Sequence, residues 1–322
     1  MRYLSIFLFA CLSSVQVFAN AFNTDTTKYV NDLVRYTLDS GQIFGNFIKA
    51  EPCKQEETSA VALIIAGSGP TNADGNNPFL KSNTYKYLAE ELGRNGISSF
   101  RYDKRGIGRS AEHAPKESDL RFDIYVNDAN TIINDLHEQG YKKIYIIGHS
   151  EGSLIGMIVA ANNKYVTKFI SIAGPGTSAD LVLKEQFKDQ GEEISKIADP
   201  MIDSVKAGLT VKNVPPFMKS VFRKSVQGYM NSWFKYDPQV EIKKLTIPIL
   251  IVQGTNDLQV KVIDAQKLYL ANNKSTLRII DNMNHVMRIV NSESKADNFK
   301  AYNDPKLPLA PELLKTVVEF LK

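Results

Sequence analysis

The stretch that decides the fold is residues 144–161, which read IYIIGHSEGSLIGMIVAA. Its apolar start, residues 144–147, predicts a buried strand, and residues 153–161 predict a buried helix. Between them lies a Gly-x-Ser-x-Gly sequence, in which Gly148 and Gly152 flank Ser150. A strand, this turn and a helix together make a nucleophile elbow, in which only small residues fit beside the serine. The pattern predicts a nucleophilic Ser150 above a sheet edge, and the alternative is a glycine-rich turn with a chance serine.

Further strand and helix patterns alternate on both sides of this elbow. Short apolar runs predict strands at residues 60–65, 97–103, 168–173, 247–254 and 277–280. Apolar residues at helical spacing predict helices at residues 84–93, 124–139 and 263–270 and from Pro311 onward. Such alternation predicts the α/β class, with a mostly parallel sheet covered by helices on both faces. Ahead of it, the runs at 33–38 and 43–48 predict a β-hairpin, within an N-terminal segment of residues 20–55.

The alternation stops between residues 177 and 240, where no strand-like run occurs and the apolar residues have helical spacing. A helical insertion of this length is long for an α/β connection and predicts a lid or cap. It divides the predicted core into residues 56–176 and 241–322. The alternative is helical packing with no role at the site.

The N-terminus predicts export. Residues 1–19 contain Arg2, then an apolar stretch and the small-residue end Val17-Phe18-Ala19, which is typical of a secretory signal peptide. The apolar run is too short and too interrupted by serines to predict a membrane span. We therefore expect a periplasmic or extracellular protein, with lipid attachment at Cys11 as the alternative. After cleavage Cys53 would be the single cysteine, so no internal disulfide is expected, and its loop-like context predicts no catalytic role.

Composition narrows the classes of function. The chain has 322 residues, 43% hydrophobic and 23% charged, as is ordinary for a globular protein. Its net charge of +4 is small, and no basic stripe with interleaved aromatic residues is present, so nucleic-acid binding is not expected. No histidine or cysteine cluster has metal-ligand spacing. We predict no metal and no cofactor.

The base for Ser150 can be selected by elimination, because the chain has only four histidines. A serine hydroxyl needs an imidazole base and usually a carboxylate that orients it. His137 lies within a predicted helix, and His113 lies in a polar loop. His149 adjoins the serine, so its side chain should point away from the Ser150 hydroxyl. His285 alone follows a predicted strand in the C-terminal half, where this motif places its histidine.

The acid is expected at the carboxyl edge of the preceding strand. Asp257 lies in the loop just after the strand at 247–254 and is well placed to accept the Nδ1 proton of His285. Asp264 begins a helix and does not fit. Asp281 is the second choice, since its position four residues before His285 could equally make it a turn cap.

Two backbone amides are expected to form an oxyanion hole. The amide of Glu151 lies at the helix start next to the nucleophile, and the other should come from the loop after the first core strand. That loop reads AGSGP at residues 66–70, and Ser68 is our choice, with Gly69 as the second.

The chain as a whole resembles the α/β-hydrolase superfamily. The matching segments are AGSGP at 66–70, RYDKRGIG at 101–108, GHSEG at 148–152, QGTND at 253–257 and NH at 284–285. In particular it is similar to bacterial esterases grouped with serine-aminopeptidase-like hydrolases. The resemblance implies an α/β-hydrolase fold, a Ser150, Asp257 and His285 triad and a cap between the strands near 173 and 247. Ala66-Gly67 departs from the His-Gly pair that is common in the superfamily.

These features predict a serine hydrolase that cleaves small or short-to-medium carboxylic esters through an acyl-enzyme. Four cap side chains suit an acyl chain or a small aromatic group: Phe217, Phe222, Trp233 and Phe234. A serine exopeptidase that acts on short peptide-like substrates is the alternative, and it needs a cap carboxylate such as Glu185, Glu192 or Glu193. A non-catalytic binding protein on a hydrolase scaffold is a third hypothesis, and the set of triad residues argues against it.

Overall fold

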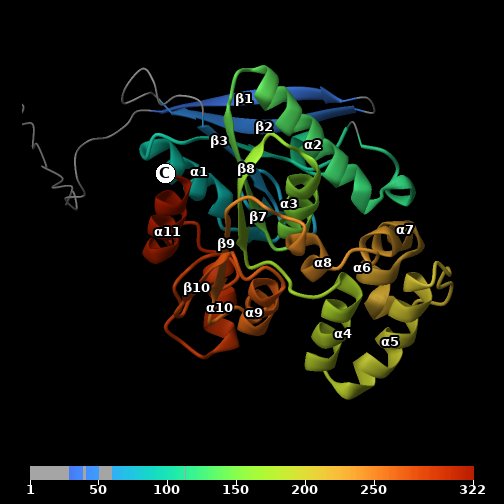
Figure 1. Cartoon of the computed structure of the whole chain (residues 1–322). Helices are drawn as coiled ribbons and strands as arrows, with labels where there is room; N and C mark the ends of the chain where they lie inside the picture. Colours follow the sequence, from blue (N-terminus) through green and yellow to red (C-terminus); the bar gives the residue numbers. More distant parts are fainter. Residues whose placement is uncertain (1–28, 39–40, 51–59, 113) are drawn as a thin grey trace, which may run out of the picture.

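The computed structural model describes residues 29–38, 41–50, 60–112 and 114–322 (Figure 1). The predicted signal peptide, Cys11, Cys53, His113 and the hairpin turn at 39–40 lie outside the described residues. No helix in the described ranges has the length and apolar character needed to cross a membrane.

Eight strands form one central sheet, in the order β1-β2-β6-β3-β7-β8-β9-β10. β1 pairs antiparallel with β2, and β2 pairs antiparallel with β6, whereas the other neighbours are parallel. The predicted hairpin and the mostly parallel sheet are therefore confirmed. The sheet strands are β1 (Tyr29–Leu38), β2 (Gly41–Ala50), β3 (Ala60–Ile65), β6 (Ser98–Tyr102), β7 (Lys143–His149), β8 (Val166–Ile172), β9 (Ile249–Gly254) and β10 (Thr276–Ile280).

Helices cover both faces of this sheet (Figure 1). In β3, Val61, Leu63 and Ile65 face one hydrophobic cluster, and Ala62 and Ile64 face the other. A strand that is buried on both sides must be apolar at every position, which explains the continuous apolar runs. The first cluster includes α2 (Phe122–Glu138), α3 (Glu151–Asn162), α8 (Pro238–Lys243) and α9 (Val262–Ala271), and the second includes α1 (Thr84–Arg94) and α11 (Pro311–Leu321).

A group of helices between β8 and β9 has a hydrophobic core of its own. Figure 1 shows these helices together beside the sheet, near α3 and α8. The insertion is thus helical, as predicted, while the division into domains at residues 177–240 stays a prediction. Its elements are α4 (Ala179–Asp189), α5 (Glu192–Lys206), η3 (Pro216–Met218), α6 (Lys219–Phe222) and α7 (Lys224–Trp233).

Several short elements are absent from the sequence-based description. The loop expected after β3 contains a small hairpin of β4 (Asn76–Asn77) and β5 (Leu80–Lys81). The helix α10 (Lys295–Tyr302) was not predicted, because its sequence KADNFKAY has little apolar pattern. The turns η1 (Gly108–Ser110) and η2 (Glu117–Asp119) lie between β6 and α2.

Candidate active site

Ser150 occupies the sharp turn between β7 and α3. Its backbone has φ 54° and ψ −122°, a conformation that L-residues rarely adopt and that marks stored strain. The flanking glycines are required by space. A Cβ at Gly148 would lie 2.3 Å from the Gly152 carbonyl oxygen, and one at Gly152 would lie 2.2 Å from the Ile65 carbonyl oxygen. The strand–turn–helix that the sequence predicts is therefore present, for the steric reason that was expected.

Asp257 and His285 form a buried pair at the carboxyl ends of β9 and β10. Asp257 Oδ2 lies 2.8 Å from His285 Nδ1. The other carboxylate oxygen accepts the amides of Gln259 and Val260 at 2.8 and 3.0 Å. Burial by itself would raise the pKa of Asp257, but His285 and the two amides outweigh it and hold that pKa below its ordinary value. The carboxylate is therefore charged, and it fixes His285 with Nδ1 as the donor, so that Nε2 is left to act as a base.

Ser150 and His285 line one cavity of about 160 Å³. Their side chains are not hydrogen-bonded to each other within the described part of the chain. Hydrogen bonds between a catalytic serine and its base are often long before substrate binds. The pairing of Ser150 with His285 is therefore judged from the cavity that both residues line. The structure thus brings together the three residues that the sequence selects as a triad.

The two predicted oxyanion donors lie at the same edge. Glu151 is the first residue of α3, where a backbone N–H has no partner within its own helix. Gly67 is packed against the nucleophile, since a Cβ built on it would lie 3.1 Å from Ser150 Cβ. Ser68 follows it and lines the cavity. The roles of the Ser68 and Glu151 amides remain predictions.

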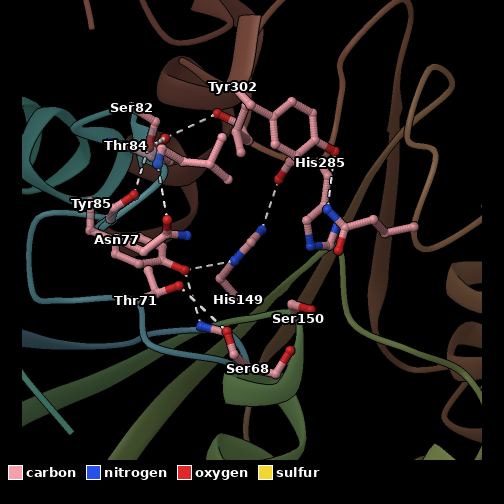
Figure 2. A pocket seen from close by; sticks show the side chains of 15 residues that line it. Ser68, Thr71, Asn77, Ser82, Thr84, Tyr85, His149, Ser150, His285 and Tyr302 are labelled. Atoms are coloured by element: carbon pink, nitrogen blue, oxygen red, sulfur yellow. Dashed lines mark hydrogen bonds between the residues drawn. The ribbon is translucent and has the colours of Figure 1, made fainter. Parts of the chain in front are cut away.

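His149 belongs to this site more closely than the sequence suggests. Both nitrogens of its ring are hydrogen-bonded to groups other than the serine hydroxyl, and the ring lines the same cavity (Figure 2). Nε2 lies 2.8 Å from the backbone oxygen of His285, and Nδ1 lies 2.8 Å from the Tyr85 hydroxyl. A carbonyl only accepts, so Nε2 carries the proton and Tyr85 donates to Nδ1. The Tyr85 oxygen in turn accepts the Gly67 N–H at 3.0 Å.

This chain of hydrogen bonds connects the Gly67 loop to the backbone of His285. Burial, together with the charge of His285, lowers the pKa of His149 to about 3. His149 is therefore neutral at any pH near 7, and its two hydrogen bonds keep fixed directions. His149 thereby links the Gly67 loop, through Tyr85, to the backbone of His285.

Much of the cavity wall comes from segments that the sequence did not mark. Asn77 and Leu80 come from the β4–β5 hairpin, Gln259 from the loop after Asp257, and Tyr302 from the end of α10. Gln259 Nε2 donates to the Tyr302 hydroxyl at 3.1 Å. The only sequence signal for Gln259 is its place two residues after Asp257, at the same strand edge.

The predicted pocket residues of the cap do not line this cavity. Phe222 and Phe234 are buried in the cap's own core. Trp233 stacks on Phe122 with ring centroids 6.0 Å apart, and Phe217 is 62% exposed. None of the four lines the cavity of Ser150 and His285 in the described structure. Aromatic residues at helical spacing serve a helix core and a binding pocket equally well, so the sequence could not separate the two.

The rejected candidates have other roles. Asp264 Oδ1 accepts the Gly176 amide at 2.9 Å, and its Oδ2 caps the start of α9. Asp281 is exposed, so it is not the partner of His285. His137 stacks on Tyr165 with ring centroids 3.7 Å apart. Among the described residues no group of histidine, cysteine, aspartate or glutamate side chains could hold a metal ion.

Comparisons with known proteins agree with this arrangement. Residues 80–231 match the family described as "Serine aminopeptidase, S33". The esterase EstD of Thermotoga maritima is 26% identical over 242 residues, which are 73% of this chain and 55% of EstD. A proline iminopeptidase of Thermoplasma volcanium is 27% identical over 144 residues, 45% of this chain and 44% of that protein. The chain thus spans about half the length of these curated relatives.

Solved structures show the same fold. Est1E from Butyrivibrio proteoclasticus superposes with a TM-score of 0.56 at 16% identity and covers 90% of this chain and 95% of its own. An esterase from Pyrococcus furiosus gives a TM-score of 0.54 at 16% identity, with coverage of 96% and 98%. The chain thus has the α/β-hydrolase fold, and the family match over residues 80–231 and the relative named esterase agree with this fold.

Proposed function

We propose that this protein is a carboxylesterase-like serine hydrolase, which cleaves small or short-to-medium acyl esters through an acyl-enzyme on Ser150. The observation that carries the proposal is that Ser150 lines one cavity with His285, the histidine that pairs with the buried Asp257. The relatives named esterase support it, and so does the small volume of about 160 Å³, which suits a small substrate group.

The chemistry would proceed in two halves. His285 Nε2 takes the proton of the Ser150 hydroxyl while Oγ bonds to the ester carbonyl carbon, and Asp257 stabilises the imidazolium. The carbonyl oxygen becomes an oxyanion held by the backbone N–H groups of Ser68 and Glu151. When the tetrahedral intermediate collapses, the C–O bond to the alcohol breaks and the alcohol leaves with the proton from His285. Water then repeats the same steps on the acyl-enzyme, which releases the acid and restores Ser150.

The charge of the cavity favours esters over peptides. An exopeptidase must hold the free amine of its substrate, which calls for a carboxylate in the cavity. No aspartate, glutamate, lysine or arginine lines this cavity in the described structure. The cap carboxylates considered for this role lie elsewhere: Glu185 pairs with Lys261 at 2.7 Å, while Glu192 and Glu193 are 82% and 87% exposed beside Lys196.

The test compares p-nitrophenyl esters of increasing acyl length with aminoacyl p-nitroanilides. We expect the wild type to prefer short esters, and Ser150→Ala to lose about 10³-fold or more in kcat and all labelling by a fluorophosphonate. Ser153→Ala, which removes a neighbouring serine that binds Ser171 at 2.7 Å, is the matched control and should keep its activity. Ester turnover that survives in Ser150→Ala would refute the mechanism. A preference for the anilides would identify a peptidase, and a wild type inactive on both and unlabelled would identify a binding protein.

We also infer that the protein acts after export. Residues 1–19 support this through the single positive charge, the apolar stretch and the small-residue end. Expression of the full chain in a bacterium with fractionation, followed by N-terminal sequencing, should find a mature protein that begins after Ala19 or Ala21. A chain retained intact in the cytoplasm would overturn the inference, and a lipid-modified Cys11 would replace it with anchoring.

A further inference from the structure

A buried lysine lies directly behind the candidate oxyanion hole. Lys104 and Glu151 have side chains that are each 2% exposed, and Lys104 Nζ lies 2.7 Å from Glu151 Oε1. The same ammonium donates to the backbone oxygen of Gly67 at 2.7 Å. It thus binds both segments that carry the predicted oxyanion donors, although it comes from a third segment, the loop after β6.

The contact with Gly67 determines where the Ser68 amide points. The Gly67 C=O and the Ser68 N–H belong to one planar trans peptide, so they point in opposite directions. An ammonium that holds the oxygen from one side therefore aims the N–H toward the other side. The positive charge of the ammonium beside the carbonyl oxygen also polarises the peptide, so the Ser68 N–H becomes a stronger donor.

The contact with Glu151 acts on the second donor. Glu151 contributes its backbone N–H from the first position of α3, and its carboxylate is held at both oxygens. Lys104 donates to Oε1, and the Tyr229 hydroxyl donates to Oε2 at 2.7 Å. Tyr229 lies on α7, so the cap is tied to the residue that follows the nucleophile. Glu151 is thereby held by one partner from the loop after β6 and by another from the cap.

From this geometry we propose that Lys104 is a positioning residue for the oxyanion hole. It sets the Gly67–Ser68 peptide and the start of α3 at a fixed separation, so that both N–H groups converge on one point. The inference rests on the proposed ester hydrolysis at Ser150. An ion pair with a purely structural role would contribute to folding and leave the chemistry of the folded protein unchanged.

The test variant is Lys104→Met combined with Glu151→Gln. This pair removes both charges together and leaves no buried carboxylate without a partner, while the backbone N–H of residue 151 remains. We expect kcat for a short p-nitrophenyl ester to fall about 10- to 100-fold with KM changed less than about threefold, because only the transition state carries the oxyanion. The matched control is Arg105→Met with Asp128→Asn, which removes a neighbouring buried pair of 2.7 Å that joins the same loop to α2. It should keep kcat in its folded fraction.

A second readout isolates the oxyanion. Sulfur accepts weaker hydrogen bonds than oxygen, so the wild type should cleave an ester faster than its thionoester, and this preference should shrink in the double variant. Lys104→Arg, which keeps the charge but has a planar head of different reach, serves if the double variant does not fold. Lys104→Arg should lose less kcat than the double variant and should show the same reduced preference for the ester over the thionoester. If the wild type cleaves esters and a folded variant keeps both its kcat and its preference for the ester, this inference alone is overturned. A wild type without esterase activity would overturn the proposed function.

Discussion

The buried, neutral His149 predicts that the stability of this protein decreases between pH 7 and pH 5. Its pKa is lowered to about 3 from an ordinary value of 6.5, first by burial and then by the charge of His285. The unfolded chain therefore binds a proton in this range that the folded chain does not bind. Stability is fully present above the unfolded pKa and is lost as the pH falls toward the folded value. With these two values the loss between pH 7 and pH 5 is about 2 kcal/mol.

Urea unfolding at the two pH values measures this loss. The comparison is between wild type and His149→Gln, which cannot titrate but whose amide can still donate to the His285 carbonyl. The variant is expected to be less stable at pH 7, because the Tyr85 hydroxyl loses its acceptor, yet its stability should depend less on pH by about 2 kcal/mol. At pH 5 most carboxyl groups remain ionised, so they contribute little to the difference.

His137 provides the control. It stacks on Tyr165 at the partly exposed end of α2, so His137→Gln measures the effect of replacing a histidine outside the His149 hydrogen bonds. Equal losses of stability in wild type and His149→Gln would show that His149 is protonated in the folded protein. The fixed directions assigned to its two hydrogen bonds would then be wrong.

Three other changes address the elbow, the acid and the cavity wall. Gly152→Ala places a Cβ about 2 Å from the Ile65 carbonyl, so we expect a loss of several kcal/mol in the free energy of unfolding, measured by urea, or no folded protein at all. Asp257→Asn should keep the fold but lower kcat by about 10⁴-fold, since His285 loses the partner that fixes its tautomer; a loss below about tenfold in steady-state ester assays would argue against this acid. Leu80→Trp should fill the cavity and reduce the turnover of longer p-nitrophenyl esters more than that of the acetate, and equal effects on all chain lengths would place the acyl group elsewhere.

The elbow could be read from the sequence because its determinants are local. The requirement for glycine at 148 and 152 arises from contacts within the turn and with the adjacent strand β3. Asp257 and His285 were also predictable, since parallel strands bring the loops at their carboxyl ends to one edge. Position after a strand, together with the chain order of the motif, selected His285 and put Asp257 ahead of Asp281, with no knowledge of distances.

The cavity wall could not be read in this way. Tyr302 and Asn77 reach the cavity through a short helix and a short hairpin whose sequences have no strong periodic pattern. In the cap the difficulty is the opposite one: its apolar pattern is strong, and it describes the cap's internal core around Phe222. Periodicity reports which face of a helix is buried, and it does not report whether a protein core or a substrate lies against that face.

The two unspecified positions of the Gly-x-Ser-x-Gly sequence explain how the strained turn is held. His149 binds Tyr85 and the backbone of His285, whereas Glu151 binds Lys104 and Tyr229. A residue with the backbone conformation of Ser150 costs about 1–3 kcal/mol and persists only where its surroundings hold it in place. The neighbours before and after Ser150 provide this support through their buried, hydrogen-bonded side chains. Because Lys104 and Tyr85 both also bind Gly67, the contacts that hold the nucleophile hold the oxyanion loop as well, and a change at either contact should alter the two together.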